Sequence, residues 1–307
     1  MTETEVRPLF GGVEAGGTKF VCAIGTGPDD VRATARIDVT TPAETIPAAI
    51  RFFREAVERG VRLDAIGIGS FGPVELRDGH PRYGFITSTP KPGWSGTDIV
   101  GPFAGAFGIP VGFDTDVNGA ALAEGRWGAA RGLGSFVYLT VGTGIGGGAV
   151  VDGRLVHGLG HPEMGHVAVP RRPGDDFPGR CPFHGACFEG MASGPAIGDR
   201  FGRRAETLEG PERDEAAALA GWYLAAGVRS IVYALAPERI IVGGGLASMP
   251  GMLEAARAEL RSQLQGYPGL PEHLDDSFIS AAALGGMAGP AGTLVLAELK
   301  LAEARGG

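Results

Sequence analysis

The stretch Thr140-Val141-Gly142-Thr143-Gly144-Ile145-Gly146-Gly147-Gly148 lies between two apolar segments, and it decides the fold of the chain. Residues 136–139 before it and 149–151 after it are apolar and largely β-branched or aromatic, as strands require. The pattern therefore predicts a strand, a glycine turn and a second strand. Glycines permit positive φ and bring backbone N–H groups close to a ligand, so the turn suits an anionic oxygen. A glycine-rich hairpin that binds nothing is the alternative interpretation.

A second turn of the same kind lies near the N-terminus, within residues 11–24. Its central residues are Gly16-Gly17-Thr18-Lys19, again between two apolar segments. Gly12 and Gly17 have the spacing of a P-loop, but Thr18-Lys19 reverses the required Lys-Ser/Thr order, and a strand follows instead of a helix. The motif is therefore not a Walker A loop. Two glycine turns indicate two lobes, with Lys19 either a phosphate contact or a solvated turn residue.

The composition excludes several classes of protein. The chain has 307 residues and a formal net charge of -8, without a run of basic residues that could neutralise a nucleic-acid backbone. We therefore expect no nucleic-acid partner. Residues 1–5 lack the regions of a signal peptide, and no apolar run reaches the length of a membrane span, which predicts a cytoplasmic protein without a membrane contact. Three cysteines do not make a disulfide framework.

Local signals predict the elements in the first third of the chain. Residues 41–44 match a capping box with proline at the first helical position, so a helix begins there and ends at Gly60. Residues 63–73 form a short buried strand that runs into a glycine-rich loop, where a substrate could touch the backbone. The proline-rich segment 83–94 is expected to be a loop. The core face of the helix is predicted to hold Ile46, Ala49, Ile50, Phe53 and Val57.

Two aspartates follow the next predicted strand. Residues 109–113 form that strand, and Asp114-Thr115-Asp116-Val117-Asn118 separates it from an alanine-rich helix that runs from Gly119 to about Ala130. A carboxylate at this position is often only a helix N-cap. With two aspartates in three positions, one can cap the helix while the other faces a ligand.

The second half of the chain repeats the order of strand and helix. Helices are predicted over 214–233, 252–264 and 289–303, with strands at 239–242 and 278–282. The strand at 239–242 ends in three glycines, Gly243 to Gly245. We expect an α/β protein with a small lobe over 1–118 and a large lobe over 119–288. The helix at about 289–307 is expected to pack back on the small lobe.

A metal-ligand pattern lies in the large half. His166-x14-Cys181-x2-His184-x2-Cys187 supplies two imidazoles and two thiolates, the ligand set of a closed tetrahedral zinc site. Because all four positions are protein ligands, none is open for water, which predicts structural zinc. The intervening segment 171–179 is polar and broken by proline, so it needs a local tie. A Cys181–Cys187 disulfide and free buried thiols are the alternatives.

Five motifs together resemble the ROK family of bacterial sugar kinases and repressors: residues 14–19, 114–118 and 141–146, Glu163-x-x-His166, and Cys187-x-Glu189. The match spans nearly the whole chain. Within that family, residues 69–73, 87–94 and 181–187 look most like the fructokinases. The implied fold is the two-lobed α/β fold of actin-like and hexokinase-like ATPases, which is ribonuclease H-like, with a central cleft.

The resemblance also implies roles for individual residues. Asp116 would be the catalytic base, and Glu14 would hold Mg2+. A homodimer is implied as well. Sugar contacts would come from Glu163, His166, Glu189 and Gly72, with His166 also a zinc ligand. ATP would contact Gly16, Gly17, Thr18, Lys19, Gly142, Thr143, Gly144, Pro195, Gly244 and Gly245.

Three positions depart from the family pattern. Glu14 stands where the family usually has Asp, so a magnesium site must accept a longer side chain. Thr115 stands where glucokinase-like members usually have Asn, which argues against glucose as the main substrate. His184 replaces the more frequent cysteine arrangement, which also points to the fructokinases.

The expected activity is ATP-dependent phosphorylation of the 6-hydroxyl of D-fructose. A mannokinase or glucokinase of the same family is the first alternative. A sugar-responsive repressor is the second, but such regulators carry a helix-turn-helix domain before the first glycine turn, where this sequence has only residues 1–8. A sugar-binding module without catalysis would not need Asp116.

Overall fold

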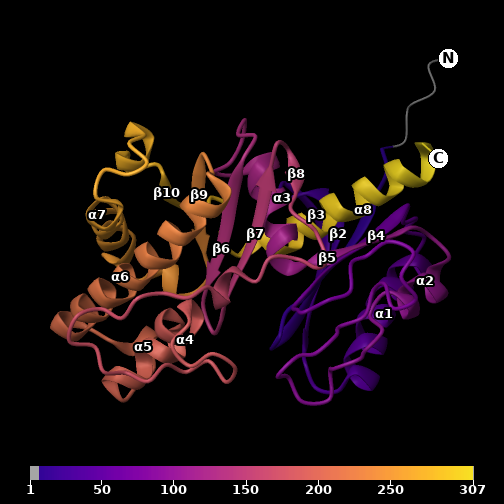
Figure 1. Ribbon diagram of the computed structural model, residues 1–307. Helices are drawn as coiled ribbons and strands as arrows, with labels where there is room; N and C mark the ends of the chain where they lie inside the picture. Colours follow the sequence, from indigo (N-terminus) through magenta and orange to yellow (C-terminus); the bar gives the residue numbers. More distant parts are fainter. Residues whose placement is uncertain (1–6, 307) are drawn as a thin grey trace. The chain divides into compact units, whose positions relative to one another are not determined.

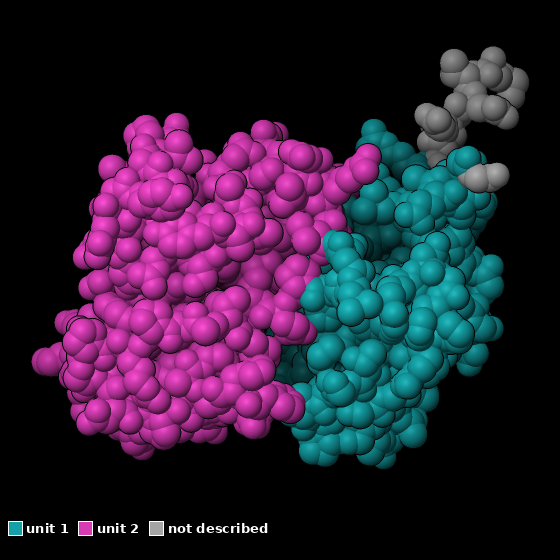
Figure 2. Space-filling model, viewed as in Figure 1, with its two compact units in different colours: residues 1–123, 157–161, 286–307 teal, residues 124–156, 162–285 magenta. Residues whose placement is uncertain are grey.

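The computed structural model describes residues 7–306, which form two compact units (Figure 2). Unit 1 comprises the described part of residues 1–123 together with 157–161 and 286–307, and unit 2 comprises 124–156 and 162–285. Each unit is built around one five-stranded sheet. The segment 157–161 is a short piece of unit 1 between two stretches of unit 2.

The sheet of unit 1 has the order β3-β2-β1-β4-β5 (Figure 1). β1 pairs with β2 in antiparallel register and with β4 in parallel register, and β4 is parallel to β5. Helices cover both faces, because Gly11 approaches Phe53 of α1 while its neighbour Gly12 approaches Thr293 of α8. The elements are β1 (Phe10–Ala15), β2 (Lys19–Gly27), β3 (Asp30–Asp38), α1 (Pro42–Glu58), β4 (Ala65–Ser70), α2 (Gly101–Phe107), β5 (Val111–Thr115), α8 (Ala288–Gly306) and the first part of α3 (Asp116–Trp127), whose residues from Glu124 on belong to unit 2.

The sheet of unit 2 has the order β10-β9-β6-β7-β8. β6 is antiparallel to β7 and parallel to β9, which in turn is parallel to β10. Its strands are β6 (Phe136–Val141), β7 (Ile145–Val151), β8 (Arg154–Leu155), β9 (Arg239–Gly243) and β10 (Ile279–Ala281). Its helices are α4 (Phe188–Ala192), α5 (Gly194–Phe201), α6 (Gly210–Leu235) and α7 (Met252–Leu264).

Helix α6 is the central helix of unit 2. Its length and apolar composition would suffice to cross a membrane, which no other helix in the described residues matches, but 61% of its apolar window is buried inside the structure. It packs against α4, where Gly227 lies on the ring of Phe188, and against α7, where Gly221 lies on Ala255. Its apolar character is therefore that of a core helix.

The structure confirms both predicted hairpins and corrects three local predictions. Val57 is 44% exposed, and the neighbouring Ala56 takes its place in the core. The Thr41 side chain makes no capping hydrogen bond, and Glu44 instead accepts from Thr40 Oγ1 at 2.7 Å. Helix α3 begins at Asp116 rather than at Gly119. Here Thr115 caps the helix, since its Oγ1 accepts from the Asn118 N–H at 3.1 Å.

Helix α8 lies on β1, β4 and β5 at backbone contact distance (Figure 1). A Cβ at Gly67 would lie 1.8 Å from the Thr293 carbonyl oxygen, and one at Gly112 would lie 2.2 Å from the Leu296 oxygen. A Cβ at Gly292 would lie 2.0 Å from the Gly119 oxygen. All three obstacles are backbone atoms, which cannot move out of the way as a flexible side chain can. Glycine at these positions therefore sets how close the helix lies to the sheet.

We predict that Gly67→Ala lowers the free energy of unfolding by about 3 kcal/mol, because the added methyl group forces α8 away from the sheet. The measurement is urea unfolding of the full chain, followed by circular dichroism. Gly105→Ala in α2 is the matched control, since a Cβ there meets nothing within 4 Å. Alanine favours helix by up to about 1 kcal/mol, so the control is expected to be neutral or slightly stabilising. Equal midpoints for the two variants would contradict the packing argument.

Candidate functional site

The glycine turn of unit 1 joins β1 to β2 and leaves its backbone accessible. Gly17 and Thr18 are exposed, and a Cβ at Gly17 would meet nothing within 4 Å. Gly16 N donates to the Lys19 carbonyl oxygen at 3.0 Å, which closes the turn. Neither Gly16 nor Gly17 has the positive φ that glycine permits, so the turn does not depend on left-handed backbone at these two positions.

The glycine turn of unit 2 joins β6 to β7, and hydrogen bonds to Glu189 and Gly194 hold it in place. Glu189 Oε2 accepts from the Ile145 N–H at 3.0 Å, and a Cβ at Gly144 would lie 2.7 Å from the same oxygen. The Gly142 carbonyl oxygen accepts from the Gly194 N–H at 2.7 Å. Gly142 and Gly144 also lack positive φ. Among the predicted ATP-binding residues, Gly244 has a positive φ, of 91°. A Cβ at Gly244 would lie 2.5 Å from the Val141 carbonyl oxygen.

A cavity of 620 Å³ opens beside this turn, entirely within unit 2. Its volume is in the range of small-molecule and cofactor sites. Four predicted ATP contacts line it: Gly142, Thr143, Pro195 and Gly245. The structure thus brings together residues from the β6–β7 turn, the start of α5 and the end of β9, which lie up to about a hundred residues apart in the sequence.

Three arginines that the sequence analysis missed also line this cavity: Arg180, Arg203 and Arg204. Each is paired with a carboxylate, Arg180 with Asp199, Arg203 with Glu212, and Arg204 with Glu206 at 3.2 Å. Guanidinium groups suit phosphate and ribose oxygens, because they donate several hydrogen bonds from a plane. No motif marks these positions, and the adjacent pair Arg203-Arg204 was the one signal available.

Glu14 and Asp116 form an acidic pair in unit 1. Glu14 lies near the end of β1 against the start of α8, where its carboxylate approaches Gly289. Burial, and then the negative charge of Asp116, raise the pKa of Glu14 to about 7, while Lys19 acts in the opposite direction. Two carboxylates that repel one another in a partly buried place favour a bound cation. The two carboxylates therefore suit a divalent cation such as Mg2+.

Asp114 does not have the capping role that one of the two aspartates was expected to take. Its side chain is buried, and its carboxylate accepts from the Thr115 N–H at 2.7 Å and from Asn118 Nδ2 at 2.6 Å. It also pairs with His157 Nε2 at 2.9 Å. Asp116, at the first position of α3, accepts from the Val117 N–H at 2.9 Å. Asp114 is thus an internal anchor of the turn, and Asp116 is the more accessible of the two aspartates.

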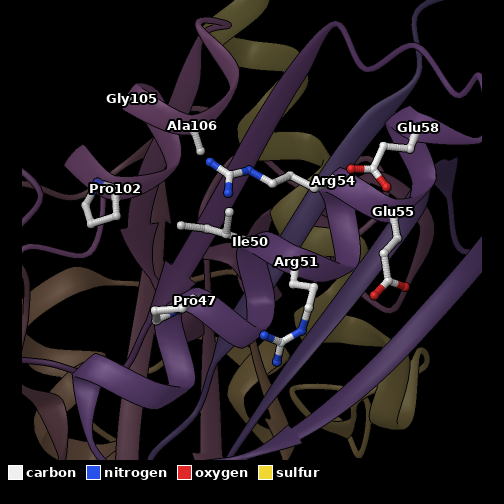
Figure 3. Close-up of a pocket in the computed structure, with 9 residues that line it drawn as sticks. All are labelled: Pro47, Ile50, Arg51, Arg54, Glu55, Glu58, Pro102, Gly105 and Ala106. Atoms are coloured by element: carbon white, nitrogen blue, oxygen red, sulfur yellow. The ribbon is translucent and has the colours of Figure 1, made fainter.

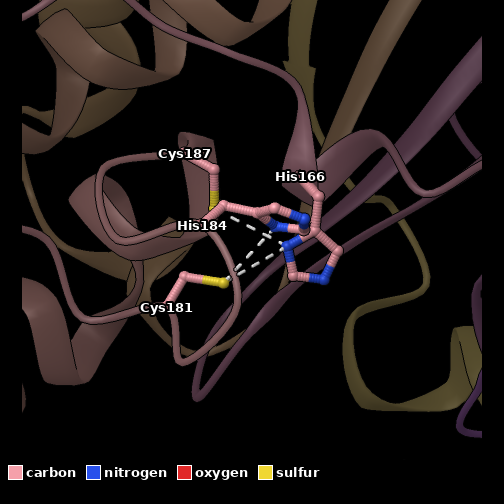
Figure 4. Close-up of side chains that lie close together, drawn as sticks. All are labelled: His166, Cys181, His184 and Cys187. Carbon is pink, nitrogen blue, oxygen red and sulfur yellow. Dashed lines mark hydrogen bonds between the residues drawn. The ribbon is translucent and has the colours of Figure 1, made fainter. Parts of the chain in front are cut away.

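The four predicted zinc ligands converge in unit 2 (Figure 4). One donor atom from each of His166, Cys181, His184 and Cys187 lies within 4.8 Å of every other. The Cys181 sulfur is 3.7 Å from Nδ1 of both histidines, and the Cys187 sulfur is 3.6 Å from His166 Nδ1. Tetrahedral zinc with bonds of about 2.3 Å to sulfur and about 2.0 Å to nitrogen separates these atoms by about 3.5 Å. The donor set and its spacing therefore suit zinc.

The two cysteines of the cluster are buried free thiols. Burial raises the pKa of the Cys187 thiol to about 11, so without a metal this sulfur is neutral. All three cysteines are free thiols in this structure, and no disulfide joins Cys181 to Cys187. The polar segment 171–179, between His166 and Cys181, has a second tie that the sequence did not reveal. Asp175 accepts from Arg200 at 2.9 Å and from the Tyr223 hydroxyl at 2.6 Å.

The predicted sugar contacts lie on both units. Gly72 follows β4 in unit 1, whereas Glu163, His166 and Glu189 belong to unit 2. Glu163 precedes a single 3-10 turn, Met164–His166, and its carbonyl oxygen accepts from the His166 N–H at 3.0 Å. This turn fixes the spacing of Glu163 and His166. The Glu189 carboxylate has the additional contact with Ile145 described above.

A second cavity of 720 Å³ lies between α1 and α2 of unit 1 (Figure 3). Its charged lining residues are exposed and carry both signs: Arg51, Arg54, Glu55 and Glu58. None of the motifs described above contributes to it. Although larger, it lacks the converging backbone groups and buried polar atoms of a specific site.

Comparisons with known proteins agree with the fold and with these motifs. The chain is 44% identical over 294 residues to a fructokinase of Zymomonas mobilis, covering 95% of this chain and 97% of that one. A ROK hexokinase structure from Thermus thermophilus has a TM-score of 0.77 and 31% identity, covering 97% of this chain and 100% of the other. A ROK glucokinase from Streptomyces griseus, solved with glucose and AMPPNP, has a TM-score of 0.73 and 25% identity, covering 95% and 99%.

These structures confirm the predicted two-lobed α/β fold of hexokinase-like ATPases. The sequence pattern of the ROK family matches residues 10–300, which include every motif from which the resemblance was drawn. The chain therefore belongs to the ROK family.

Proposed function

We propose that this chain is an ATP-dependent fructokinase that phosphorylates the 6-hydroxyl of D-fructose in the cytoplasm. The observation that carries the proposal is the 44% identity to a fructokinase over almost the full length of both chains. Identity to the glucose-bound glucokinase is lower, at 25%. Thr115 supports the same choice, because it replaces an asparagine that is usual in glucokinase-like members.

Asp116 is proposed as the general base. It would accept the proton of the 6-hydroxyl while the hydroxyl oxygen forms a bond to the terminal phosphorus of ATP and the bond from that phosphorus to ADP breaks. Phosphoryl transfer of this kind depends on alignment and charge neutralisation more than on covalent catalysis. A carboxylate at the first position of a helix, beside a turn fixed by Asp114, is suited to such alignment.

The two glycine turns are proposed to bind the phosphates of ATP. Backbone N–H groups at Gly16 to Thr18 and at Gly142 to Gly144 would donate to phosphate oxygens, and Lys19 would add a positive charge. The cavity beside Pro195 and Gly245 would hold the adenosine, because it opens directly from the second turn. Mg2+ would neutralise phosphate charge when bound. Glu14 would hold it, directly or through water.

The sugar would be held by Glu163, His166 and Glu189, with the backbone at Gly72. Carboxylates and imidazoles accept and donate hydrogen bonds to several hydroxyls, as a polyhydroxylated substrate requires. We further propose that the cluster of His166, Cys181, His184 and Cys187 binds structural zinc, which would fix His166 and α4. Zinc has no place in the reaction, because all four coordination positions are protein ligands.

The substrate is tested by a coupled assay of ADP release with fructose, mannose, glucose and N-acetylmannosamine. Fructose is expected to give the highest kcat/KM, with mannose or glucose as weaker acceptors. The position of the phosphate is then checked by nuclear magnetic resonance of the product. The specificity proposal fails if fructose turns over no better than the other three sugars.

Asp116→Asn is expected to lower kcat by about a thousandfold, because general base catalysis contributes factors of this order. Sugar affinity should stay near the wild-type value, since the amide keeps the size of the side chain. Steady-state kinetics and calorimetric fructose binding give the two quantities. Asp29→Asn is the control, because this aspartate is exposed at the β2–β3 turn. Near wild-type turnover in Asp116→Asn would remove Asp116 from the mechanism.

Freshly purified protein is expected to contain one zinc ion per chain by elemental analysis. Cys187→Ser should lose the metal and unfold at a lower temperature, because metal binding contributes directly to folding energy. Cys22→Ala is the control, since Cys22 is buried in the core of unit 1 and should leave the zinc content unchanged. Zinc-free wild-type protein, or full zinc content in Cys187→Ser, would refute the site.

A further inference from the structure

The carboxylate of Asp114 is a buried charge with three donors. Its relative exposure is 3%, and it accepts from the Thr115 N–H at 2.7 Å and from Asn118 Nδ2 at 2.6 Å. The third donor is His157 Nε2, at 2.9 Å from Oδ2. A carboxylate taken out of water needs such partners, because an unpaired buried charge is strongly unfavourable.

Two of these bonds lie on either side of Asp116. Thr115 precedes it and Asn118 follows it by two residues, so Asp114 holds the Thr115 backbone N–H before the proposed base and the Asn118 side chain after it. Asn118 N also donates to Thr115 Oγ1 at 3.1 Å, which completes the turn. The backbone of Asp116 also packs against Gly69, where a Cβ would lie 3.3 Å from the Asp116 Cα. The position of Asp116 therefore depends on Asp114 keeping its place.

His157 is the partner of Asp114 that comes from outside this turn. It opens the segment 157–161, which lies with unit 1 although unit 2 precedes and follows it in the chain. The segment has a second anchor at its other end, since His161 Nε2 accepts from the Val74 N–H at 3.1 Å. Val74 comes two residues after Gly72, in the loop proposed to contact the sugar.

In its contact with Asp114, His157 must donate a hydrogen bond from Nε2 to the carboxylate. An imidazole that carries a proton on Nε2 donates to Asp114 whether the ring is neutral or charged. A protonated Nε2 cannot accept a hydrogen bond from Asn118 Nδ2, which lies 3.3 Å away. We therefore assign the Nε2 proton to the shorter contact, with Asp114 at 2.9 Å. The hydrogen bond to Asp114 raises the pKa of His157, as a donor to a carboxylate requires.

We infer that His157 is a positioning residue for phosphoryl transfer: it holds the Asp114 carboxylate, and through it the turn 114–118, so that Asp116 keeps the geometry of a general base. The inference rests on the proposed role of Asp116 and adds a residue that is not among the proposed substrate contacts. A positioning role can be distinguished from a purely structural role, because it predicts that loss of His157 lowers kcat more than it changes substrate affinity.

The test compares His157→Ala with His157→Gln in the full chain. The alanine variant should lower kcat by roughly ten- to a hundredfold, since small displacements of reacting groups have effects of this size. KM for fructose and for ATP should change by less than about twofold, as neither substrate loses a contact. Glutamine can place its amide nitrogen near the position of Nε2, so His157→Gln should recover most of the lost kcat.

Leu159→Ala is the matched control within the same segment. Leu159 is 87% exposed, and its truncation should leave kcat and both KM values unchanged. Asp114→Asn, alone and combined with His157→Ala, completes a double-mutant cycle. The double variant should be no slower than the slower single variant, because both substitutions break the same contact, between Asp114 and His157.

Amide hydrogen exchange of the peptide that covers 114–118 supplies a readout that does not depend on activity. Exchange should be faster in His157→Ala and close to wild type in His157→Gln and Leu159→Ala. Wild-type exchange and wild-type kcat in His157→Ala would overturn the inference, as would an effect on KM alone or equal losses in the alanine and glutamine variants. If wild-type protein phosphorylates no sugar, the proposed function fails, and the exchange result still decides whether His157 fixes the turn.

Discussion

The close approach of α8 to the sheet of unit 1 is the constraint on which the site in that unit depends. The helix touches the backbone of β4 and β5 where Gly67 and Gly112 carry no side chain, and it touches α3 through Gly292 and Gly119. The same helix begins against the Glu14 carboxylate, which removes water from that group and contributes to its raised pKa. An ordinary packing distance would therefore leave Glu14 more solvated and move α3, which begins with Asp116. The packing distance of α8 therefore affects both the position of Asp116 and the pKa of Glu14.

The parts that sequence reasoning could predict are those whose signal is local. A glycine turn between two apolar segments depends on neighbouring residues only, so both hairpins were correct. The four residues predicted as zinc ligands lie within 22 consecutive residues, and the structure brings their side chains together. Helix α7 was predicted from Met252 to about Leu264, in agreement with its observed bounds. These features need no knowledge of distant contacts.

The parts that could not be predicted depend on contacts between distant residues. Arg180 and Arg204 line one cavity together with the β6–β7 turn, to which the start of α5 is joined by the hydrogen bond from Gly194 N–H to the Gly142 carbonyl oxygen. The role of Asp114 required His157, which is 43 residues away and lies in a segment that nothing in the sequence separates from its neighbours. Glycine permits positive φ, but Gly16, Gly17, Gly142 and Gly144 do not adopt it, and a side chain at position 144 would collide with Glu189. Composition alone does not distinguish these two uses of glycine.

The metal cluster and the glycine turn of unit 2 are connected through a helix of five residues. Cys187 is the N-cap of α4, and Glu189 is the second residue of that helix. The Glu189 carboxylate accepts from the Ile145 N–H and fills the space that a side chain at position 144 would need. A metal that fixes Cys187 therefore fixes the start of α4, and with it the carboxylate beneath the turn. The proposed structural zinc would thus stiffen a loop that is too polar to pack by itself, and this stiffness would reach the backbone proposed to hold phosphate.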